Sequence, residues 1–471
     1  MAPGDGEEPV LTPTPVRRDR RGLRATRAGR FRAPSTPFLL RLGMALACLP
    51  VVAFAVAIHV GVERNDSTVR TVGREATRGI TVAQALKVEL AELDGVVVRS
   101  LLGRAPLNTT GFPDDYNAKR AELHDSLVLA ALVSSSGSVY EQPLVNIDYV
   151  LSHYHALIKD AFAAARDGDI AGASATYGQA HQVMAETLLP EADFLDKANS
   201  YVLNDSYDRH TARSASTARL ILVSWLAVLA FLVLAQVLVA KRFRRVLNLG
   251  LALATVVALV SGALTLNRLD ASSDHLTSAR EQDFDSVHVL ARARATVESA
   301  RQAQGQFLLG PPAAADAQTD FDHHVSRLLR VQGSNPTDAT DFAEASTLPD
   351  GAGGYLARVA SPGATNPEPE SVRQVMVAFG AFLNEDAAMR DLVNSGGLGA
   401  ATARYMDGQA YGDLNDAINA AQGIEQEAFD DAAGAAADAA APLDDINLVA
   451  APAILLLALL GLFQRLREYR A

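Results

Sequence analysis

The sequence predicts an all-α protein with four transmembrane helices and two tandem extracytoplasmic four-helix bundles. Three observations support this prediction. Four apolar runs of 18 to 21 residues contain no Asp, Glu, Lys or Arg, the two long segments between them place apolar residues at helical spacing, and these two segments share sequence landmarks. A helix rises about 1.5 Å per residue, so about 20 residues cross the hydrocarbon core of a bilayer. Each run is therefore long enough to span it.

The apolar runs predict four membrane crossings, at 38–62, 220–240, 246–266 and 446–463, the first of which contains the apolar run 42–62. The first run is too long for the apolar core of a cleaved signal peptide. It also contains Cys48, which follows small and apolar residues, as the lipid-modified cysteine of a lipoprotein does. The apolar run continues beyond this cysteine as far as Val62, whereas a lipoprotein turns polar soon after its cysteine. We therefore expect a transmembrane helix, with a lipid anchor as the alternative.

Charge predicts the orientation of these crossings, because cytoplasmic segments next to membrane helices are rich in Lys and Arg. The arm 1–37 carries eight arginines, the turn 241–245 carries four basic residues, and the tail 464–471 carries three arginines. These three segments belong in the cytoplasm, and the arm is expected to be disordered. The segments 63–219 and 267–445 carry net charges of −6 and −17 and are expected outside. The sequence thus predicts a multi-pass cell-membrane protein with both termini in the cytoplasm.

Apolar residues in the first outer segment follow the helical period. From Val69 to Leu101 they recur every three or four residues, which is typical of a helix with one buried face. Gly103 and Pro106 should end this helix. Further helices are expected over Asp114–Val133, over Pro143–Arg166, and from about Asp169 back to the membrane. Short links between such helices give antiparallel neighbours and hence a four-helix bundle. Pro190 should kink or break the fourth helix.

The two outer segments are related copies. The triplet Leu101-Leu102-Gly103 matches Leu308-Leu309-Gly310 at an offset of 207, and Gly168–Tyr177 matches Gly396–Tyr405 at an offset of 228. Such internal similarity predicts two copies of one fold. Because the second offset is the larger, the second copy has gained residues between the two landmarks. They fall in 331–371, where abundant Pro, Gly, Ser, Thr and Asp predict a loop.

The sequence contains no pattern typical of an enzyme, a metal site or a cofactor site. One cysteine excludes a disulfide within the chain and a cysteine-based metal site. The pairs His153/His155 and His323-His324 are spaced so that they point to different helix faces, so we expect them to be surface residues. The net charge of −12 argues against nucleic-acid binding. We therefore expect no enzyme activity, no cofactor and no bound metal.

Two groups of basic residues are candidate contact sites. Arg99 and Arg104 lie near the distal end of the first outer helix, where they could bind a carboxylate ligand. Ordinary surface arginines are the alternative. The second group lies in the predicted cytoplasmic segments, where it could contact a partner or anionic lipid, with a simple topology anchor as the alternative. It consists of Arg17, Arg18, Lys241, Arg242, Arg244 and Arg245.

The order of these features resembles a known class of receptors. A first helix ending at Leu101-Leu102-Gly103 and a late helix starting at Gly168-Asp169 resemble the four-helix-bundle sensor domains of bacterial chemoreceptors and histidine kinases. In the second copy, Gly397 replaces the Asp. Those receptors end in a large cytoplasmic output domain, whereas the short turn 241–245 and the short tail after Phe463 leave no room for one. A tandem pair of sensors with four crossings and no effector resembles the actinobacterial GlnX-type membrane protein family.

This resemblance implies a function. It implies a non-enzymatic signal relay that passes amino-acid status from an extracytoplasmic solute-binding lipoprotein to a cytosolic Ser/Thr protein kinase. Independently of the resemblance, the crossings and the basic arm predict contact with membrane lipid, and a homodimer is a further expectation. Three alternatives stay open from the sequence: a scaffold of the cell envelope, a direct small-molecule sensor, and a transporter. A transporter would need a polar path, which the uncharged crossings do not provide.

Overall fold

The computed structural model describes most of the chain, namely residues 36–70, 77–133, 141–243, 248–310, 314, 316–331, 351–360 and 369–470. Within these ranges the backbone is helical apart from short turns and one isolated β-bridge between Arg330 and Gly353. The prediction of an all-α fold is therefore confirmed.

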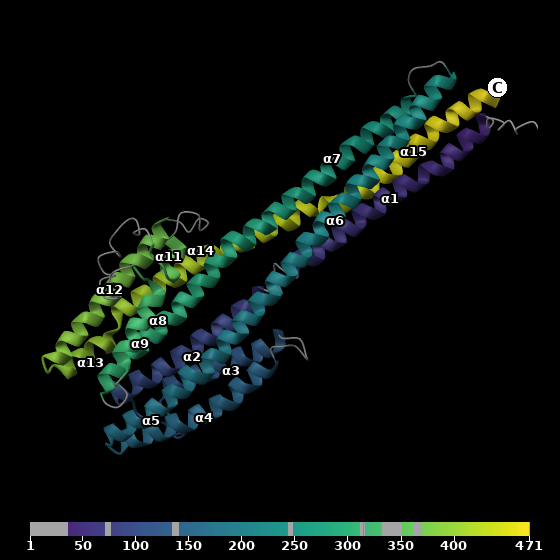
Figure 1. Cartoon of the computed structure of the whole chain (residues 1–471). Helices are drawn as coiled ribbons and strands as arrows, with labels where there is room; N and C mark the ends of the chain where they lie inside the picture. Colours follow the sequence, from purple (N-terminus) through teal and green to yellow (C-terminus); the bar gives the residue numbers. More distant parts are fainter. Residues whose placement is uncertain are drawn as a thin grey trace, which may run out of the picture.

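Four long helices run together along one end of the molecule, and the helices that form the two bundles lie at the other end (Figure 1). The long helices are α1 (Thr36–Arg70), α6 (Leu189–Phe243), α7 (Leu249–Ser278) and α15 (Pro442–Arg470). The stretches long and apolar enough to cross a membrane are Ala45–Arg64, Ala215–Lys241, Leu249–Ser278 and a fourth within Leu398–Gln464. These agree with the four crossings expected from the sequence.

The first bundle contains α2 (Thr77–Gly103), α3 (Asp114–Val133), α4 (Glu141–Arg166), α5 (Ile170–Val183) and the first part of α6. The bounds of α3 coincide with the prediction. Asp169 caps α5 as expected, because its carboxylate accepts a hydrogen bond of 2.8 Å from the Gly172 amide. Helix α2 ends as predicted at Gly103, but the left-handed residue that closes it is Arg104, with a φ of 49°.

The fourth helix of this bundle does not break at Pro190. Between α5 and α6 lies a π-helical segment, η2 (Met184–Leu188), after which the helix continues. The Leu189 amide donates to the Met184 carbonyl, five residues back, as π geometry requires. Proline has no amide hydrogen and its ring crowds the carbonyl four residues before it. The structure therefore changes helical geometry just before Pro190 instead of ending the helix.

The second bundle repeats the first. It contains α8 (Asp285–Leu309), α9 (Ala317–Leu328), α11 (Tyr355–Ala360), α12 (Pro369–Asn394), α13 (Leu398–Asp407) and α14 (Gln409–Ala440), and a second π segment, η3 (Ala279–Phe284), joins α7 to α8. Helix α12 starts and ends at one and the same offset from α4, and α13 starts at that offset from α5. This offset, 228, also separates Gly168–Tyr177 from Gly396–Tyr405, which supports the repeat.

The stretch 331–371 is not simply a loop. It contains α11, and α12 already begins at Pro369; the remainder of the predicted loop falls mostly outside the described residues. The second copy also differs near its late helices, because Gly408, with a φ of 63°, separates α13 from α14. The first copy is helical at the equivalent position, Ala180. The two bundles therefore share a plan but differ in detail.

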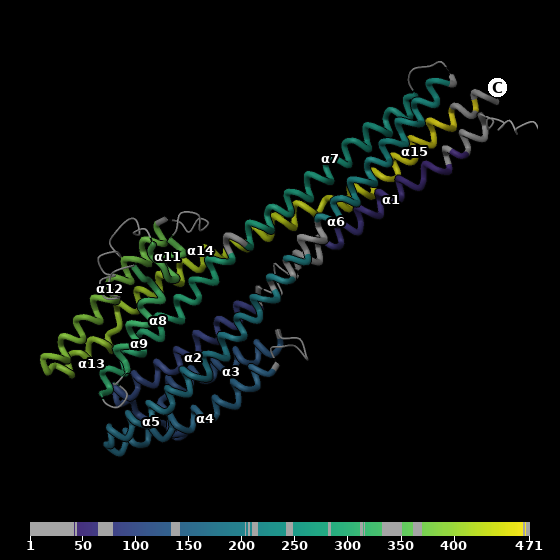
Figure 2. The backbone as a smooth tube through the Cα atoms, in the orientation of Figure 1, coloured from purple at the N-terminus to yellow at the C-terminus, as the bar shows by residue number. Residues whose placement is uncertain are grey.

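Helices α2 and α8 pack against each other where the two bundles meet and run parallel. Arg294 of α8 bonds to Glu92 of α2, and further along both helices Gly305 lies against Val98. A Cβ added to Gly305 would collide with Val98 Cγ1, so only glycine allows this approach. Gly305 and Val98 are 207 positions apart, the same offset that separates the Leu-Leu-Gly triplets of the two halves. The two bundles thus pack as a pair of related subunits within one chain, which the backbone trace in Figure 2 shows side by side.

Candidate functional site

Polar and charged side chains are buried where the two bundles meet. We call this region the inter-bundle interface; it is formed by α2, α5 and α6 on one side and by α8, α13 and α14 on the other. Helix α8 contributes most to it, because almost every residue from Ser286 to Gln306 is buried, including Glu298, Arg301 and Gln302. Buried polar groups are costly unless they are paired, so their partners define the site.

Asp94 is the centre of a network inside the first bundle. Its carboxylate is fully buried and accepts hydrogen bonds from the Tyr154 hydroxyl at 2.6 Å and the Tyr177 hydroxyl at 3.2 Å. Nδ1 of His181 lies 3.0 Å from the same carboxylate. Burial, and then the charge of Asp94, raise the pKa of Tyr154 and of Tyr177, so both hydroxyls act as donors. Gln302 of α8 donates to Tyr177 at 3.2 Å and connects this network to the second bundle.

The repeat places a cation at the position equivalent to this anion. At the offset of 207, Arg301 occupies the position of Asp94, and at the offset of 228, Tyr405 occupies the position of Tyr177. The Arg301 guanidinium carbon lies 3.9 Å from the centre of the Tyr405 ring and 5.3 Å from that of Tyr411, a cation–π arrangement. Arg301 also donates to the Tyr405 carbonyl oxygen. Related positions in the two halves thus carry opposite charges.

Glu298 lies beside Arg301 and is 1% exposed. It accepts a hydrogen bond from the Tyr411 hydroxyl. Burial raises the pKa of Glu298 to about 7, although the bond from Tyr411 and the positive charge of Arg99 act in the opposite direction. A carboxyl group with such a pKa changes charge near neutral pH.

The two predicted ligand residues, Arg99 and Arg104, lie in different surroundings. Arg99 is half-buried on α2, close enough to Glu298 for its charge to lower the pKa of that carboxyl group. It therefore belongs to the inter-bundle interface. Arg104 is exposed at the end of α2. The ligand-binding role of both arginines stays a prediction.

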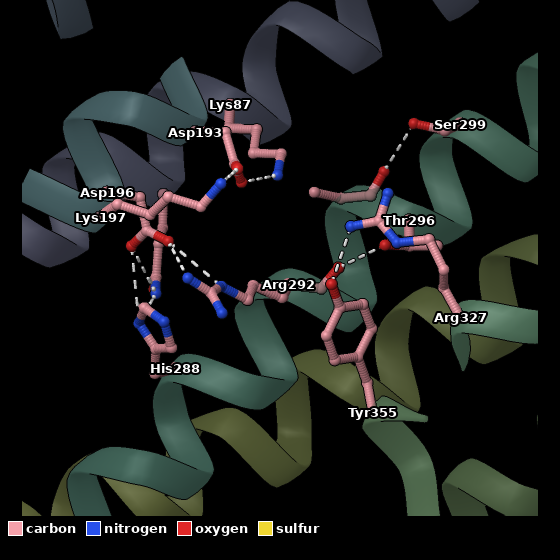
Figure 3. A network of polar contacts seen from close by, with 12 residues as sticks. Lys87, Asp193, Asp196, Lys197, His288, Arg292, Thr296, Ser299, Arg327 and Tyr355 are labelled. Carbon is pink, nitrogen blue, oxygen red and sulfur yellow. Dashed lines mark hydrogen bonds and ion pairs between the residues drawn. The ribbon is translucent and has the colours of Figure 1, made fainter. Parts of the chain in front are cut away.

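A second network lies closer to the membrane helices (Figure 3). The buried Asp196 of α6 accepts hydrogen bonds from Nε and Nη2 of Arg292, at 3.1 and 2.6 Å, and lies 3.5 Å from Nδ1 of His288. Asp193, one turn earlier, bonds to Lys87 at 2.7 Å and to Lys197 at 2.6 Å. Burial alone would raise the pKa of Asp193, but the bonds from Lys197 and Lys87 bring it down to about 2. These contacts tie α2, α6 and α8 together.

Sequence reasoning missed these interface residues, although a signal existed for some. Asp94 follows Leu90 by four positions, so it lies on the apolar face of its predicted helix. A charge on such a face is buried and needs a partner. The expectation of surface histidines was also wrong in part, because His155 and His324 are partly buried, and burial lowers the pKa of both.

The predicted cytoplasmic contact residues are only partly described. Lys241 and Arg242 lie in the last turn of α6. The other four, Arg17, Arg18, Arg244 and Arg245, lie outside the described residues.

A comparison with protein families supports a sensor in the first bundle. Residues 68–208 match the family model of an actinobacterial sensor domain. The matched range contains α2 to α5 and the part of α6 from Leu189 to Asp208. No curated protein and no solved structure matches the chain. A sensor domain of this type indicates a signalling role and suggests that the role is not enzymatic.

Proposed function

We propose that the protein is a non-enzymatic transmembrane signal relay, in which the two bundles respond to a condition outside the cell and the membrane helices pass the response to the cytoplasm. The observation that carries this proposal is the continuity of α6. This helix begins inside the matched sensor domain, which ends at residue 208, and continues through the second candidate span to Phe243. Its 55 residues correspond to about 82 Å of helix. A shift of its outer part is therefore transmitted to its inner end.

The inter-bundle interface supplies the two-state element of this relay. Glu298 and Arg301 are buried in it, and Gln302 connects it to Tyr177 of the Asp94 network, so a small displacement of α2 against α8 changes strong electrostatic interactions. The π segment η3 lies where α7 enters the second bundle, and such segments often occur at functional positions in helices. A binding event that prefers one arrangement by about 1.4 kcal/mol shifts the equilibrium tenfold.

The proposed partners follow from the family resemblance and the expected topology. Outside the cell, a solute-binding lipoprotein carrying amino-acid status would contact the bundles. Inside, a Ser/Thr protein kinase would contact the basic segments that contain Arg17, Arg18, Lys241, Arg242, Arg244 and Arg245, and the same residues would face anionic lipid. The chain could also form a homodimer. A second candidate function, direct sensing of a small molecule, is favoured by an open cavity of about 600 Å³ lined by residues of α6, η3, α8 and α11.

The test of the relay is co-purification of partners with the full-length protein from native membranes. A variant lacking residues 1–37, with Lys241, Arg242, Arg244 and Arg245 changed to Gln, should lose the cytosolic kinase and keep the outer partner. The matched control replaces four exposed outer basic residues by Gln, namely Arg166, Arg209, Arg373 and Arg404. Unchanged kinase recovery with the first variant would show that the basic segments do not carry the output.

The expected topology has its own test. Cys48 is the single cysteine of the sequence, so a Cys48→Ala variant has none. Single cysteines can then be introduced at Asp160, exposed on α4, and at Lys241, exposed at the end of α6. A membrane-impermeant maleimide should label Asp160→Cys in intact cells and should label Lys241→Cys only after the membrane is opened. Labelling of Lys241→Cys in intact cells would contradict the orientation on which the relay depends.

A further inference from the structure

A buried carboxyl group lies where the two bundles meet and has no charged partner in direct contact. Glu298 of α8 is buried and accepts a hydrogen bond from the Tyr411 hydroxyl of α14. It forms no ion pair with any residue that the structure describes, although Arg301 lies one turn later on the same helix. Burying a carboxylate without a paired cation is costly, so this group favours its neutral form in the arrangement seen here.

The first bundle packs at the same place without such a group. At the offset of 207, Glu298 corresponds to Ala91, and at the offset of 228, Tyr411 corresponds to Val183. Ala91 is fully buried, and Val183 packs against the core of the first bundle. The fold therefore forms with apolar side chains at both positions. The pair of Glu298 with Tyr411 belongs to the second half alone, so its role lies outside the folding of a bundle.

Arg99 of α2 lies at the level of Glu298. Helices α2 and α8 are parallel, and the ion pair of Arg294 with Glu92 sets their register. Glu298 follows Arg294 by about one turn, so it lies beside the turn of α2 that follows Glu92. Gly95 is in that turn, and the Arg99 guanidinium folds back onto it. A Cβ added to Gly95 would meet Nη1 of Arg99 at 3.5 Å.

Arg99 is also the cation that can move toward Glu298. Its side chain is half-buried, and its guanidinium forms no hydrogen bond or ion pair with the described part of the chain. The other two nearby arginines are already engaged. Arg294 pairs with a carboxylate of α2 at 2.7 Å, and Arg301 donates two hydrogen bonds within the second bundle. Neither can turn to Glu298 without losing these bonds.

We propose that ionisation of Glu298 draws the Arg99 guanidinium into an ion pair across the inter-bundle interface, so that pH sets how firmly the two bundles are joined. At low pH the neutral carboxyl group keeps its bond with Tyr411, and Arg99 stays on α2. At high pH the carboxylate and the guanidinium pair, and this pair connects the first half of the chain to the second. The inference rests on the proposed relay for its role, which is to make the relay respond to pH on the side of the membrane where the bundles lie.

The electrostatics of the site support ionisation near neutral pH. Burial raises the pKa of Glu298 to about 7; the bond from Tyr411 lowers it, the charge of Glu92 raises it, and the charges of Arg99 and Arg294 lower it. A pair with Arg99 offsets only part of the cost of burying the charge, so the folded protein still binds this proton more tightly than the unfolded chain does. Among the described residues, the charged and titratable groups that face Glu298 are Glu92 and Arg99 from α2, Arg294 and Arg301 from α8, Tyr405 from α13 and Tyr411 from α14.

The first test is a pH titration of the full-length protein in lipid nanodiscs, followed by difference infrared spectroscopy of protonated carboxyl groups. A band that titrates at about pH 7 and is absent from Glu298→Gln is expected. Arg99→Gln should raise the midpoint of this band by about one pH unit, because it removes the cation that stabilises the carboxylate. Glu92→Gln should lower the midpoint, because it removes a neighbouring negative charge.

The second test measures how the bundles are joined. In a Cys48→Ala background, spin labels are attached to Asp160→Cys and Asn384→Cys, which replace exposed residues of α4 and α12. Pulsed electron paramagnetic resonance should give a narrower distribution of distances between the labels above the midpoint than below it. The same distribution at both pH values is expected when Arg99→Gln or Glu298→Gln is added, because either change removes the ion pair.

The control is Arg166→Gln, which removes an exposed arginine paired with Asp167 at the end of α4 and should keep the midpoint and the pH-dependent distances. Circular dichroism melts verify that each variant is folded. Persistence of the band in Glu298→Gln, an unchanged or lower midpoint in Arg99→Gln, or label distances that ignore pH would each overturn the proposal. Neither test involves a partner, so the result is independent of the co-purification experiment that tests the relay.

Discussion

Tyr177 and Tyr405 offer a comparison in which one half of the chain serves as the control for the other. Both occupy the same repeat position and both are fully buried. The Tyr177 hydroxyl donates to Asp94 at 3.2 Å and accepts from Gln302 at 3.2 Å. Among the described residues, the Tyr405 hydroxyl is buried without a hydrogen-bond partner. Removal of each hydroxyl by substitution with Phe should therefore have opposite consequences.

The magnitude follows from these contacts. Loss of a hydrogen bond to a charged group costs about 1.5–3 kcal/mol, and the length of the Tyr177 bond favours the lower value. Tyr177→Phe should therefore destabilise the first bundle by about 1.5 kcal/mol. Tyr405→Phe removes a polar group that has lost its hydration and gained no partner, so it should be neutral or should stabilise by up to about 1 kcal/mol.

Hydrogen exchange measured by mass spectrometry on the full-length protein in nanodiscs separates the two bundles. A difference of about 1.4 kcal/mol is a factor of ten, so amides of α5 should exchange about tenfold faster in Tyr177→Phe. Amides of α13 should exchange at the same rate or more slowly in Tyr405→Phe. Equal acceleration in both variants would refute the assignment of different roles to the two hydroxyls.

Three further predictions concern buried groups. Burial raises the pKa of Glu298 to about 7, so between about pH 4.5 and 7 the folded protein holds a proton that the unfolded chain has released. This group therefore makes stability fall as pH rises through that range. Glu298→Gln should flatten this part of the profile of melting temperature against pH, and an unchanged slope would contradict the prediction. Gly305→Ala places a Cβ against Val98 of α2 and should lower the stability of the packed helices by about 1–3 kcal/mol, measured as faster hydrogen exchange of α8. In the control Gly178→Ala, the added Cβ meets nothing within 4 Å, so this variant should be slightly stabilised. Gly262→Ala would place a Cβ against the indole nitrogen of Trp225, so the emission spectrum of this single tryptophan should shift, and an identical spectrum would show that the ring does not pack there.

The helices of the first bundle could be predicted from the sequence because each has one apolar face toward a core. The apolar face predicted the helix that ends at Leu101, Asp114–Val133 was predicted at its observed bounds, and the end of α2 and the cap at Asp169 followed from local chemistry. Such signals are contained within a few turns of chain. They need no knowledge of distant contacts.

Helix α8 could not be predicted from a single apolar face. It lies among helices of both bundles and is buried on nearly all sides, yet it carries Glu298, Arg301 and several glutamines. Its polar residues are satisfied by side chains distant in the sequence, such as Tyr411 and Tyr405. No local pattern reveals such partners, so α8 could not be identified from the sequence as the centre of the interface.

The parallel pairing of α2 with α8 has an evolutionary consequence. Two identical chains meeting around a twofold axis must present the same side chain from each partner, so a mutation at the axis always occurs twice. A duplicated chain is free of this constraint, because each half can diverge separately while the tether keeps the halves together at high effective concentration. The anion at position 94 and the cation at position 301 are a divergence that a symmetric dimer could not have fixed one step at a time.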